Sequence, residues 1–371
     1  MSVGLGLRAM LMRSLAAGMM VQSGAVTAQV LPEDQADKPA APAGDIIVTG
    51  DAVDDRSTMP NRKLPVIDTP ATVAVISDDL IDQQGRTTLR DTLRNITGIS
   101  FQAGEGNPPG GGDAFSVRGF SARDDILVDG LRDIGNYFRD PFIAHRIDVT
   151  KGPASAFAGR GNVGGTVNIL THAPKLGDFV RAEATAGTAN LWRGEIDANV
   201  ALDYDNGIAL RVQGLVHSAD EPGRDVTRNR RWAVAPTLIF GLDGPTSVEI
   251  KLNHTQQRNI PDYGIPNVRD LSFAGSRFFG QPAPVRRSNF YGYSTDYYEV
   301  DATTATLRID HEFADGIALL HQTRHGQVHV FSLASAPRWF DARARLPRQH
   351  RFSGAARLAI IATPPGSTRP R

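Results

Sequence analysis

The stretch LWRGEIDANVALD (191–203) alternates apolar and polar side chains along its whole length. Successive side chains of a β-strand point to opposite faces, so the stretch predicts one apolar face and one charged face. The apolar face carries Trp192, Ile196, Ala198, Val200 and Leu202, and the charged face carries Arg193, Glu195, Asp197, Asn199 and Asp203. Lipid on one side of a sheet and a wet lumen on the other require such strands, so the pattern indicates a transmembrane strand.

The same alternation recurs at 208–217 and 248–253, and the connections between these strands differ in length. The short connections are the Asx-Gly turns 204–207, 241–245 and 313–316, and the long ones are 218–228 and 254–297. Short turns on one side and long loops on the other are typical of outer-membrane barrels. The sequence therefore predicts antiparallel transmembrane β-barrel strands over 178–340.

Composition excludes several classes of function. The 371 residues include 40 Lys plus Arg and 40 Asp plus Glu, so no net charge favours nucleic acid as a partner. There is no cysteine, which excludes disulfides and thiolate metal sites. No run of about 18 apolar residues occurs, so no helix is expected to span a membrane.

Residues 1–63 have the features of an export signal followed by a tether. Arg8 and Arg13 precede an apolar run at 15–21, and small residues at 26–28 offer a cleavage site, which together predict a signal peptide over 1–28. Residues 29–63 begin with a Pro-, Ala- and charge-rich stretch, which predicts an extended linker. Within this linker, DIIVTG (45–50) is a short β-prone patch.

Residues 64–175 predict a compact α+β domain. A strand is expected at 72–76, followed by a helix that Ser77 caps and Gly85 ends. A second helix is expected from Thr87 or Thr88 to Asn95. Short strands are predicted between Gly-rich turns at 99–101, 115–120, 125–130, 146–152 and 166–170.

This domain resembles the plug domain of TonB-dependent receptors. Five segments occur in the order and spacing of that family: TPATVAVIS (69–77), LRDTLRNITGIS (89–100), SVRGF (116–120), LVDGLRD (127–133) and RIDVTKGPASAFAGRGNVGGTVNILTHAP (146–174). The resemblance implies an α+β plug domain followed by antiparallel transmembrane β-barrel strands. RGFSARDDILVDGLRD (118–133) and DYGIP (262–266) are similar to the catecholate-siderophore branch.

The resemblance also implies a function, partners and a location. The expected function is TonB-dependent uptake of ferric siderophores, without catalysis, by a receptor in the cell outer membrane. The expected partners are TonB with its inner-membrane energising complex, the ferric siderophore and outer-membrane lipid. Because iron would arrive inside its siderophore, neither a cofactor nor a protein-bound metal is expected. Two alternatives remain: a receptor of the same fold for haem, cobalamin or a glycan, and a non-transporting periplasmic binding module.

The patch at 45–50 is similar to the TonB box. Its residues are Asp45, Ile46, Ile47, Val48, Thr49 and Gly50. A short strand former on a flexible tether can join the edge of a partner's sheet through main-chain hydrogen bonds. The segment is therefore expected to bind TonB.

Two further sets of side chains are predicted to be functional. Ligand contact is expected of Arg123, Arg132, Tyr137, Phe138, Arg139, Tyr291, Tyr293 and Tyr297. Guanidinium groups and aromatic faces suit an anionic ferric siderophore. Ion pairs between plug and barrel are expected from Arg118 and Arg160 to Glu195, Asp197 or Glu249, because a charged plug in a charged lumen needs paired ions.

Two other patterns indicate no chemistry. GRGNVG (159–164) matches a dinucleotide-binding pattern, but a strand-like segment follows it where that fold needs a helix. His321, His325 and His329 share one face of a strand, yet neighbours lie about 13 Å apart at ~3.3 Å per residue, too far to share an ion. They are predicted to be polar lumen or loop positions.

The end of the chain departs from the family pattern. From 178 onward there is room for about eight strands, against roughly 22 in plugged transporters. The barrel is therefore predicted to be incomplete and the chain a truncated form. After 340 the alternation fades and Arg, Pro and Ala accumulate, so 341–371 is predicted to be an aberrant tail, typical of a frameshift.

Overall fold

The computed structural model describes residues 71–101, 112–153, 163–269, 277–313 and 317–336. It also describes the backbone of three short C-terminal strands, β16 (Trp339–Phe340), β17 (Phe352–Ser353) and β18 (Ala356–Ile361). The predicted signal peptide, the linker and the TonB box all lie outside the described residues.

The predicted plug is a mixed α/β domain built on two small sheets. The five-stranded sheet has the order β1-β7-β8-β5-β6, in which β5 and β8 are parallel and the other pairs antiparallel. The three-stranded sheet has the order β2-β3-β4. The elements are β1 (Thr72–Ser77), α2 (Asp78–Gln83), α3 (Leu89–Leu93), β2 (Ile99–Phe101), β3 (Phe115–Val117), β4 (Phe120–Ser121), β5 (Ile126–Val128), β6 (Leu131–Arg132), the 3₁₀-helix η2 (Pro141–Ile143), β7 (Ala144–Lys151) and β8 (Gly165–Thr171).

Side-chain caps explain where the two helices begin. The Ser77 hydroxyl accepts a hydrogen bond from the Leu80 amide, and the Thr88 hydroxyl accepts one from the Asp91 amide. Each hydroxyl satisfies a donor that the first helical turn leaves unpaired, which confirms the two predicted caps. The second helix is shorter than predicted, however, and ends at Leu93.

The predicted strand at 115–120 is two strands joined by a tight turn. Arg118 and Gly119 have φ of 51° and 85°, so the chain reverses between β3 and β4. A glycine adopts this left-handed conformation readily, whereas an arginine adopts it only when the surrounding structure requires it.

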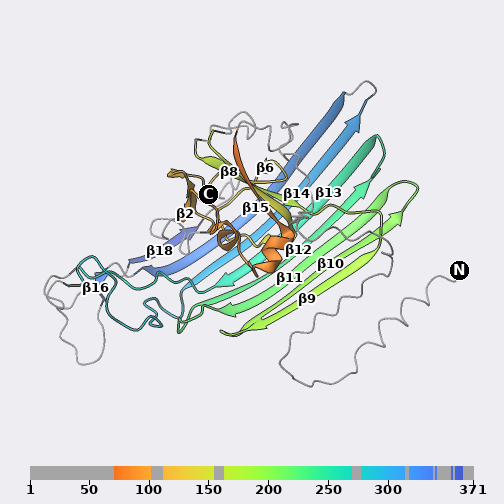
Figure 1. Ribbon diagram of the computed structural model, residues 1–371. Helices are drawn as coiled ribbons and strands as arrows, with labels where there is room; N and C mark the ends of the chain where they lie inside the picture. The colour runs from red at the N-terminus through yellow and green to blue at the C-terminus, as the bar shows by residue number, and fades with distance from the viewer. Residues whose placement is uncertain are drawn as a thin grey trace, which may run out of the picture. The chain divides into compact units, whose positions relative to one another are not determined.

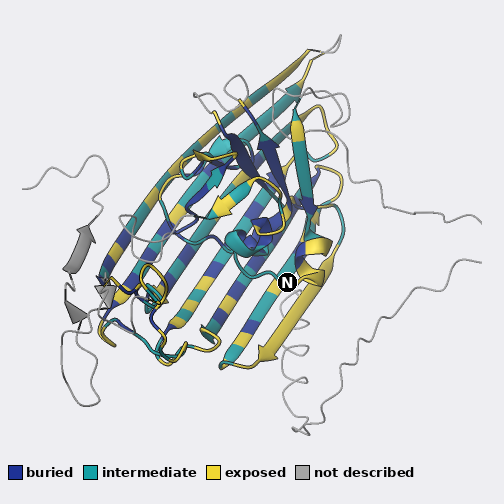
Figure 2. Cartoon of the chain, turned by 60° about the vertical axis from the view of Figure 1, so that its left-hand side comes forward, coloured by how far each residue is buried: buried dark blue, intermediate teal, exposed yellow. Residues whose placement is uncertain are grey.

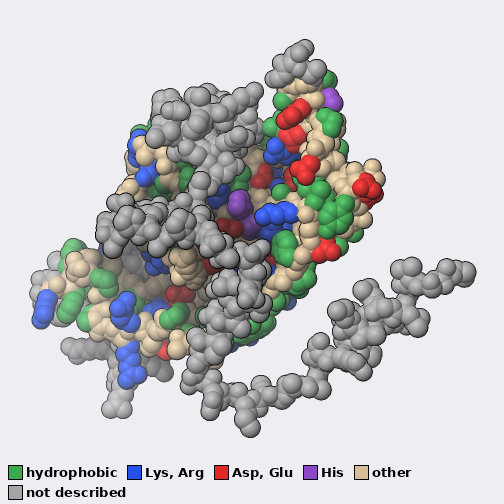
Figure 3. Space-filling view, turned by 45° about the vertical axis from the view of Figure 1, so that its right-hand side comes forward, with side chains coloured by type: hydrophobic (Ala, Val, Ile, Leu, Met, Phe, Trp, Pro, Cys, Tyr) green, Lys and Arg blue, Asp and Glu red, His purple; other side chains and the backbone are tan. Residues whose placement is uncertain are grey.

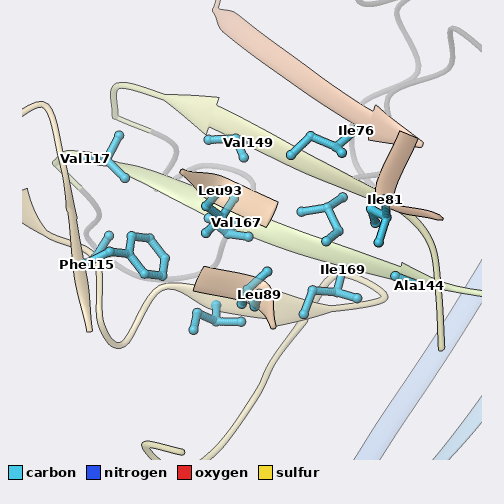
Figure 4. Packing of buried hydrophobic residues seen from close by; sticks show 13 residues of the cluster. Ile76, Ile81, Leu89, Leu93, Phe115, Val117, Ala144, Val149, Val167 and Ile169 are labelled. Atoms are coloured by element: carbon cyan, nitrogen blue, oxygen red, sulfur yellow. The ribbon is translucent and has the colours of Figure 1, made fainter. Parts of the chain in front are cut away.

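The plug has a hydrophobic core of its own, shown in Figure 4. The two helices pack Ile81, Leu89 and Leu93 against the strands, and Ile147, Val149 and Val167 meet them from β7 and β8. Every buried residue of this cluster comes from the plug itself. A domain with its own core can move as a body without exposing that core.

The large sheet follows the plug and contains eight antiparallel strands in the order β18-β15-β14-β13-β12-β11-β10-β9 (Figure 1). Its other strands are β9 (Phe179–Gly187), β10 (Leu191–Asp203), β11 (Ile208–Asp220), β12 (Arg228–Phe240), β13 (Thr246–Asn259), β14 (Tyr297–Glu312) and β15 (Ala318–Ala336). The antiparallel pairing and the number of strands confirm the prediction, but seven of the eight strands lie within the predicted range 178–340. The eighth, β18, falls in 341–371, the predicted aberrant tail, and pairs with β15, so the sheet extends beyond the predicted boundary. The connections agree in part: 204–207 and 241–245 are short and 260–296 is long, whereas the predicted long loop 218–228 is reduced to 221–227 because β11 and β12 extend into it.

The two faces of the large sheet differ as the alternation predicted. On β10, Trp192, Ile196 and Val200 are exposed, whereas Arg193 and Asn199 are buried. Figure 2 shows this alternation as bands along the strands, while β9 is exposed along its whole length. Cross-strand pairing aligns the exposed side in a row of apolar residues, Val200, Leu210, Leu238, Ile250 and Leu307.

The three histidines of β15 lie on this exposed face of the sheet, which we call the outer face. Their predicted position in the lumen or in a loop is therefore wrong. His321 pairs with Ile309 and His325 with Ala305, so their side chains share the face of the apolar row. The opposite face of β15 presents Arg324, which donates to the Leu131 carbonyl of the plug.

None of the helices in the described part of the chain is long and apolar enough to cross a membrane, a result that bears on helices alone.

Candidate functional site: the plug–sheet interface

The plug contacts the charged face of the large sheet mainly through residues 129–142. This segment begins with a two-residue turn that joins β5 to β6, in which Asp129 and Gly130 have φ of 52° and 80°. Positive φ at both central positions is what a tight hairpin turn needs, and Asp-Gly supplies it. The turn holds the Asp129 side chain at the end of the sheet, where β13 passes.

Asp129 forms the first ionic contact between plug and sheet. Its carboxylate accepts hydrogen bonds from the Thr171 amide and hydroxyl at 2.9 and 2.8 Å, and from Lys251 Nζ of β13 at 3.1 Å. Burial raises the pKa of this carboxyl, but Lys251 and the Thr171 hydrogen bonds outweigh burial and hold the pKa below its usual range. Asp129 therefore stays charged and paired.

Asp140 forms the second contact and caps η2. One carboxylate oxygen accepts from the Phe142 amide at 3.1 Å, which fixes the side chain at the start of the 3₁₀ turn. Both oxygens accept from Arg193 of β10 at 2.8 Å, and one also accepts from Arg231 Nε of β12 at 2.6 Å. The Asp140 side chain is 1% exposed. Burial raises its pKa, but the two arginines more than compensate, so the pKa lies below its ordinary value.

Arg193 also bonds Glu195 on its own strand. The cluster therefore contains two guanidinium groups and two carboxylates with no net charge. Charge-assisted bidentate bonds of this kind are among the strongest hydrogen bonds in proteins. A neutral and fully paired cluster is the arrangement that permits burial of four charges.

Several further side chains of the sheet donate to backbone carbonyls of the plug. Arg231 donates to Thr87, Arg211 to Ala173, Gln213 to Phe142 and Tyr298 to Asn136, at 2.8–3.3 Å. The sheet thus supplies cations and donors, and the plug supplies carboxylates and carbonyls. Basic, acidic and histidine side chains lie together in the central recess of Figure 3.

Among the described residues, the hydrophobic cluster that plug and sheet share is small. Tyr137 and Phe138 of the plug pack against Tyr298, Val300 and Val330 of β14 and β15. Next to it lies a cavity of about 60 Å³ lined by charged groups of both parts, including Asp129, Asp133, Arg139, Asp140, Lys251 and Arg324. A cavity of this size, with several charged groups in its lining, is large enough for water. An interface made mostly of polar contacts can separate in water at lower cost than an apolar core.

Arg139 binds within the plug. Its guanidinium contacts Asp133 at 2.7 Å and Asp113 at 3.2 Å, and its side chain is 6% exposed. Two carboxylates share this one cation, and Asp113 Oδ1 has no hydrogen-bond partner. Burial, only partly offset by Arg139, raises the pKa of Asp113 to about 6.

The predicted plug-to-barrel ion pairs require correction. Arg118 donates to the Thr72 hydroxyl inside the plug. Glu195 pairs with Arg193, Asp197 with Arg211 and Glu249 with Lys251, all within the sheet. Among the described residues the sign of the contact is reversed, with acids on the plug and bases on the sheet. Arg160 lies outside the described residues.

The predicted ligand-contact residues divide into two groups. Tyr137, Arg139 and Tyr291 are buried and Phe138 is half-buried in the cluster above, so this conformation does not present them to a ligand. Arg123 and Arg132 are partly exposed, and Tyr293 and Tyr297 are exposed. Arg132 lies 3.7 Å from Asp124. Ligand contact by these four residues stays a prediction.

Asp129, Asp140 and Arg231 were not among the predicted contact residues. The alternation already placed Arg193 and Lys251 on the charged face, which gave half of each pair. The available signals for the other half were the Asp-Gly turn at 129–130 and an Asp-Pro step at 140–141, which is typical of a capped turn.

Comparison with known proteins supports the architecture. The family described as the TonB-dependent receptor plug domain matches residues 65–166. The probable TonB-dependent receptor BfrD of Bordetella pertussis is 36% identical over 313 residues, which are 83% of this chain and 41% of BfrD. The catecholate siderophore receptor Fiu of Escherichia coli K12 is 34% identical over 286 residues, 76% of this chain and 37% of Fiu.

Solved structures agree with these matches. The crystal structure of the siderophore receptor PiuA from Acinetobacter baumannii superposes with a TM-score of 0.69 at 34% identity, over 74% of this chain and 38% of PiuA. The open form of Fiu superposes with a TM-score of 0.68 at 32% identity, over 76% of this chain and 42% of Fiu. The chain thus spans about two fifths of the length of the relatives it matches. A matched plug domain followed by an antiparallel sheet with the fold of these receptors shows that the chain belongs to the TonB-dependent receptor family, as its plug and the strands that follow.

Proposed function

We propose that the protein acts in the outer membrane as a receptor for TonB-dependent uptake of a ferric siderophore of the catecholate class. The observation that carries the proposal is the contrast between the two faces of the large sheet. One face presents the apolar row through Ile250 and Leu307, and the other holds the plug through Asp129 and Asp140. Lipid outside and a plugged polar lumen inside require this contrast.

The proposed mechanism follows from how the plug is held. TonB binds the box at 45–50 and pulls on the linker. The plug keeps its own core, while the paired charges at Lys251, Arg193 and Arg231 exchange their plug partners for water. The sheet keeps these basic groups after the plug moves, and their charge favours an anionic ferric siderophore in the lumen.

The substrate class rests on similarity and on charge. The relatives Fiu and PiuA are named as catecholate siderophore and siderophore receptors. The partly exposed Arg132 and the exposed rings of Tyr293 and Tyr297 would contact the ligand first. Iron arrives inside the siderophore as cargo, and the transport itself needs no cofactor.

Iron-limited growth tests the proposal. A strain lacking the gene for this protein would be grown beside its parent on a panel of catecholate and hydroxamate ferric siderophores. We expect the deletion to abolish growth on at least one catecholate and to leave hydroxamate-supported growth unchanged. A selective defect with haem, cobalamin or a glycan would instead identify a receptor of the same fold for another ligand. Equal growth on every source would contradict transport.

A further inference from the structure

Three side chains that commonly bind metals meet at one end of the five-stranded sheet of the plug. Asp78 begins α2 directly after β1, His145 lies near the start of β7, and His172 directly follows β8. β7 pairs antiparallel with β1 on one side and with β8 on the other. The last residues of β1, the first of β7 and the last of β8 therefore lie at the same end of the sheet.

A β-bulge directs His145 toward the other two residues. The register between β7 and β8 shifts between Ala144 and Arg146, so His145 is the extra residue of the bulge. Bulges re-aim a side chain relative to a regular strand. The His145 ring lies with its centroid 5.3 Å from that of His172.

The distances among the three groups fit one small cation. Asp78 Oδ2 lies 3.4 Å from His145 Nδ1 and 3.5 Å from His172 Nε2. All three ligand atoms lie within 4.8 Å of one another. In a tetrahedral site with metal–ligand bonds of about 2.0–2.1 Å, ligand atoms are about 3.3 Å apart. Two separations already have this value, and the exposed His145 ring can rotate to shorten the third.

We propose that Asp78, His145 and His172 form a binding site for a divalent transition-metal ion of the zinc class. Two imidazole nitrogens and one carboxylate oxygen are a ligand set that Zn²⁺ binds with a fourth position left for water. The His145 side chain is 59% exposed, so this fourth position opens to solvent. The ion would join α2, β7 and β8, and the proposal does not depend on the transport function.

The surroundings of the site favour a cation. Asp78 supplies a negative charge, and the nearby Arg211 is paired with Asp197 through a bidentate contact.

Zinc binding by the full chain tests the proposal. The purified chain in detergent, freed of metals with a chelator, would be titrated with ZnCl₂ against a fluorescent zinc chelator. We expect one site in the wild type, with affinity reduced by about 10–100-fold in His145→Ala, since even the loss of an indirect contact to a zinc ligand has that effect. Asp78→Asn, which keeps the side-chain shape, should weaken binding similarly. The double variant H145A/H172A should lose the site.

A matched control separates this site from surface histidines. His325→Ala removes an exposed histidine on β15 and should leave the zinc affinity unchanged. His145 is exposed, so its variant tests the site even if changes at His172 impair folding. Equal zinc binding by wild type and His145→Ala, or no binding by the wild type at micromolar zinc, would overturn the proposal.

Discussion

The carboxylate of Asp140 in the plug accepts two hydrogen bonds at 2.8 Å from the guanidinium of Arg193 in β10, residues that are 53 positions apart in sequence. Both side chains are nearly inaccessible to solvent, at 1% and 8% exposed. Because Arg231 binds the same carboxylate, one acid of the plug is attached to two strands of the sheet. This one buried carboxylate thus accepts three hydrogen bonds from the sheet.

Replacing Asp140 by Asn should loosen the plug. The substitution leaves two buried guanidinium groups with less negative charge, and breaking a buried ion pair in this way costs about 3–5 kcal/mol. We expect faster hydrogen exchange of the amides at 131–142 and a lower urea midpoint for the plug. Both can be measured on the protein in detergent.

Asp124→Asn is the matched control for this change. Asp124 is also an acid of the plug that faces an arginine, but its side chain is 76% exposed. Exposed ion pairs contribute about 0–1 kcal/mol, so the control should behave like the wild type. If the two variants lose the same stability, the buried contact is not what holds the plug.

The sequence predicts one half of this interface and misses the other half for a physical reason. Strand alternation has a period of two, so Arg193 and Lys251 could be placed on the charged face from local sequence alone. Their partners Asp140 and Asp129 are 53 and 122 positions away, and no local pattern records such a contact. Arg118 was therefore predicted as the plug partner. Its backbone instead adopts a left-handed conformation, and its guanidinium donates to the Thr72 hydroxyl within the plug.

The same limit applies to the zinc-class site. His145 lies 67 positions from Asp78, so no local pattern marked the two residues as neighbours. Only the bulge in β7 and the strand order β1-β7-β8 bring it to Asp78 and His172.

Arginine at Ile250 should impair insertion into lipid. Ile250 lies in the apolar row on the outer face of β13, and a lipid-facing Arg near the bilayer midplane costs about 2–4 kcal/mol. Asn253→Arg is the matched variant, because Asn253 lies three positions along the same strand and faces the plug-side cavity. Refolding into lipid vesicles, scored by protease resistance, should fail for the first variant and proceed for the second. Similar yields for both would mean that the outer face does not contact lipid.

The buried Asp113 predicts a pH dependence of plug stability. Its pKa is raised from 3.8 to about 6 in the folded protein, so the folded state binds more protons than the unfolded state between these values. Stability contributed by this group is therefore present at low pH and lost as pH rises from about 4 to about 6. Asp113→Asn mimics the protonated form, so its stability relative to the wild type should increase over that range by on the order of 1–3 kcal/mol. Urea unfolding at a series of pH values measures the difference, and a constant difference would show that Asp113 titrates normally.

Proline at Ile47 should separate ligand binding from transport. Strand addition to TonB uses main-chain hydrogen bonds of the box, and proline lacks the amide hydrogen that this pairing needs. Introduced into the receptor on the chromosome, Ile47→Pro should abolish siderophore-dependent uptake of radioactive iron and leave siderophore binding to whole cells unchanged. Ile47→Val keeps both the amide and the β-propensity, so it should transport normally. Undiminished uptake by the proline variant would show that residues 45–50 are not the segment that couples the receptor to TonB. Loss of binding together with uptake would instead place the defect in folding or export, since a coupling segment on the periplasmic tether does not contact an external ligand.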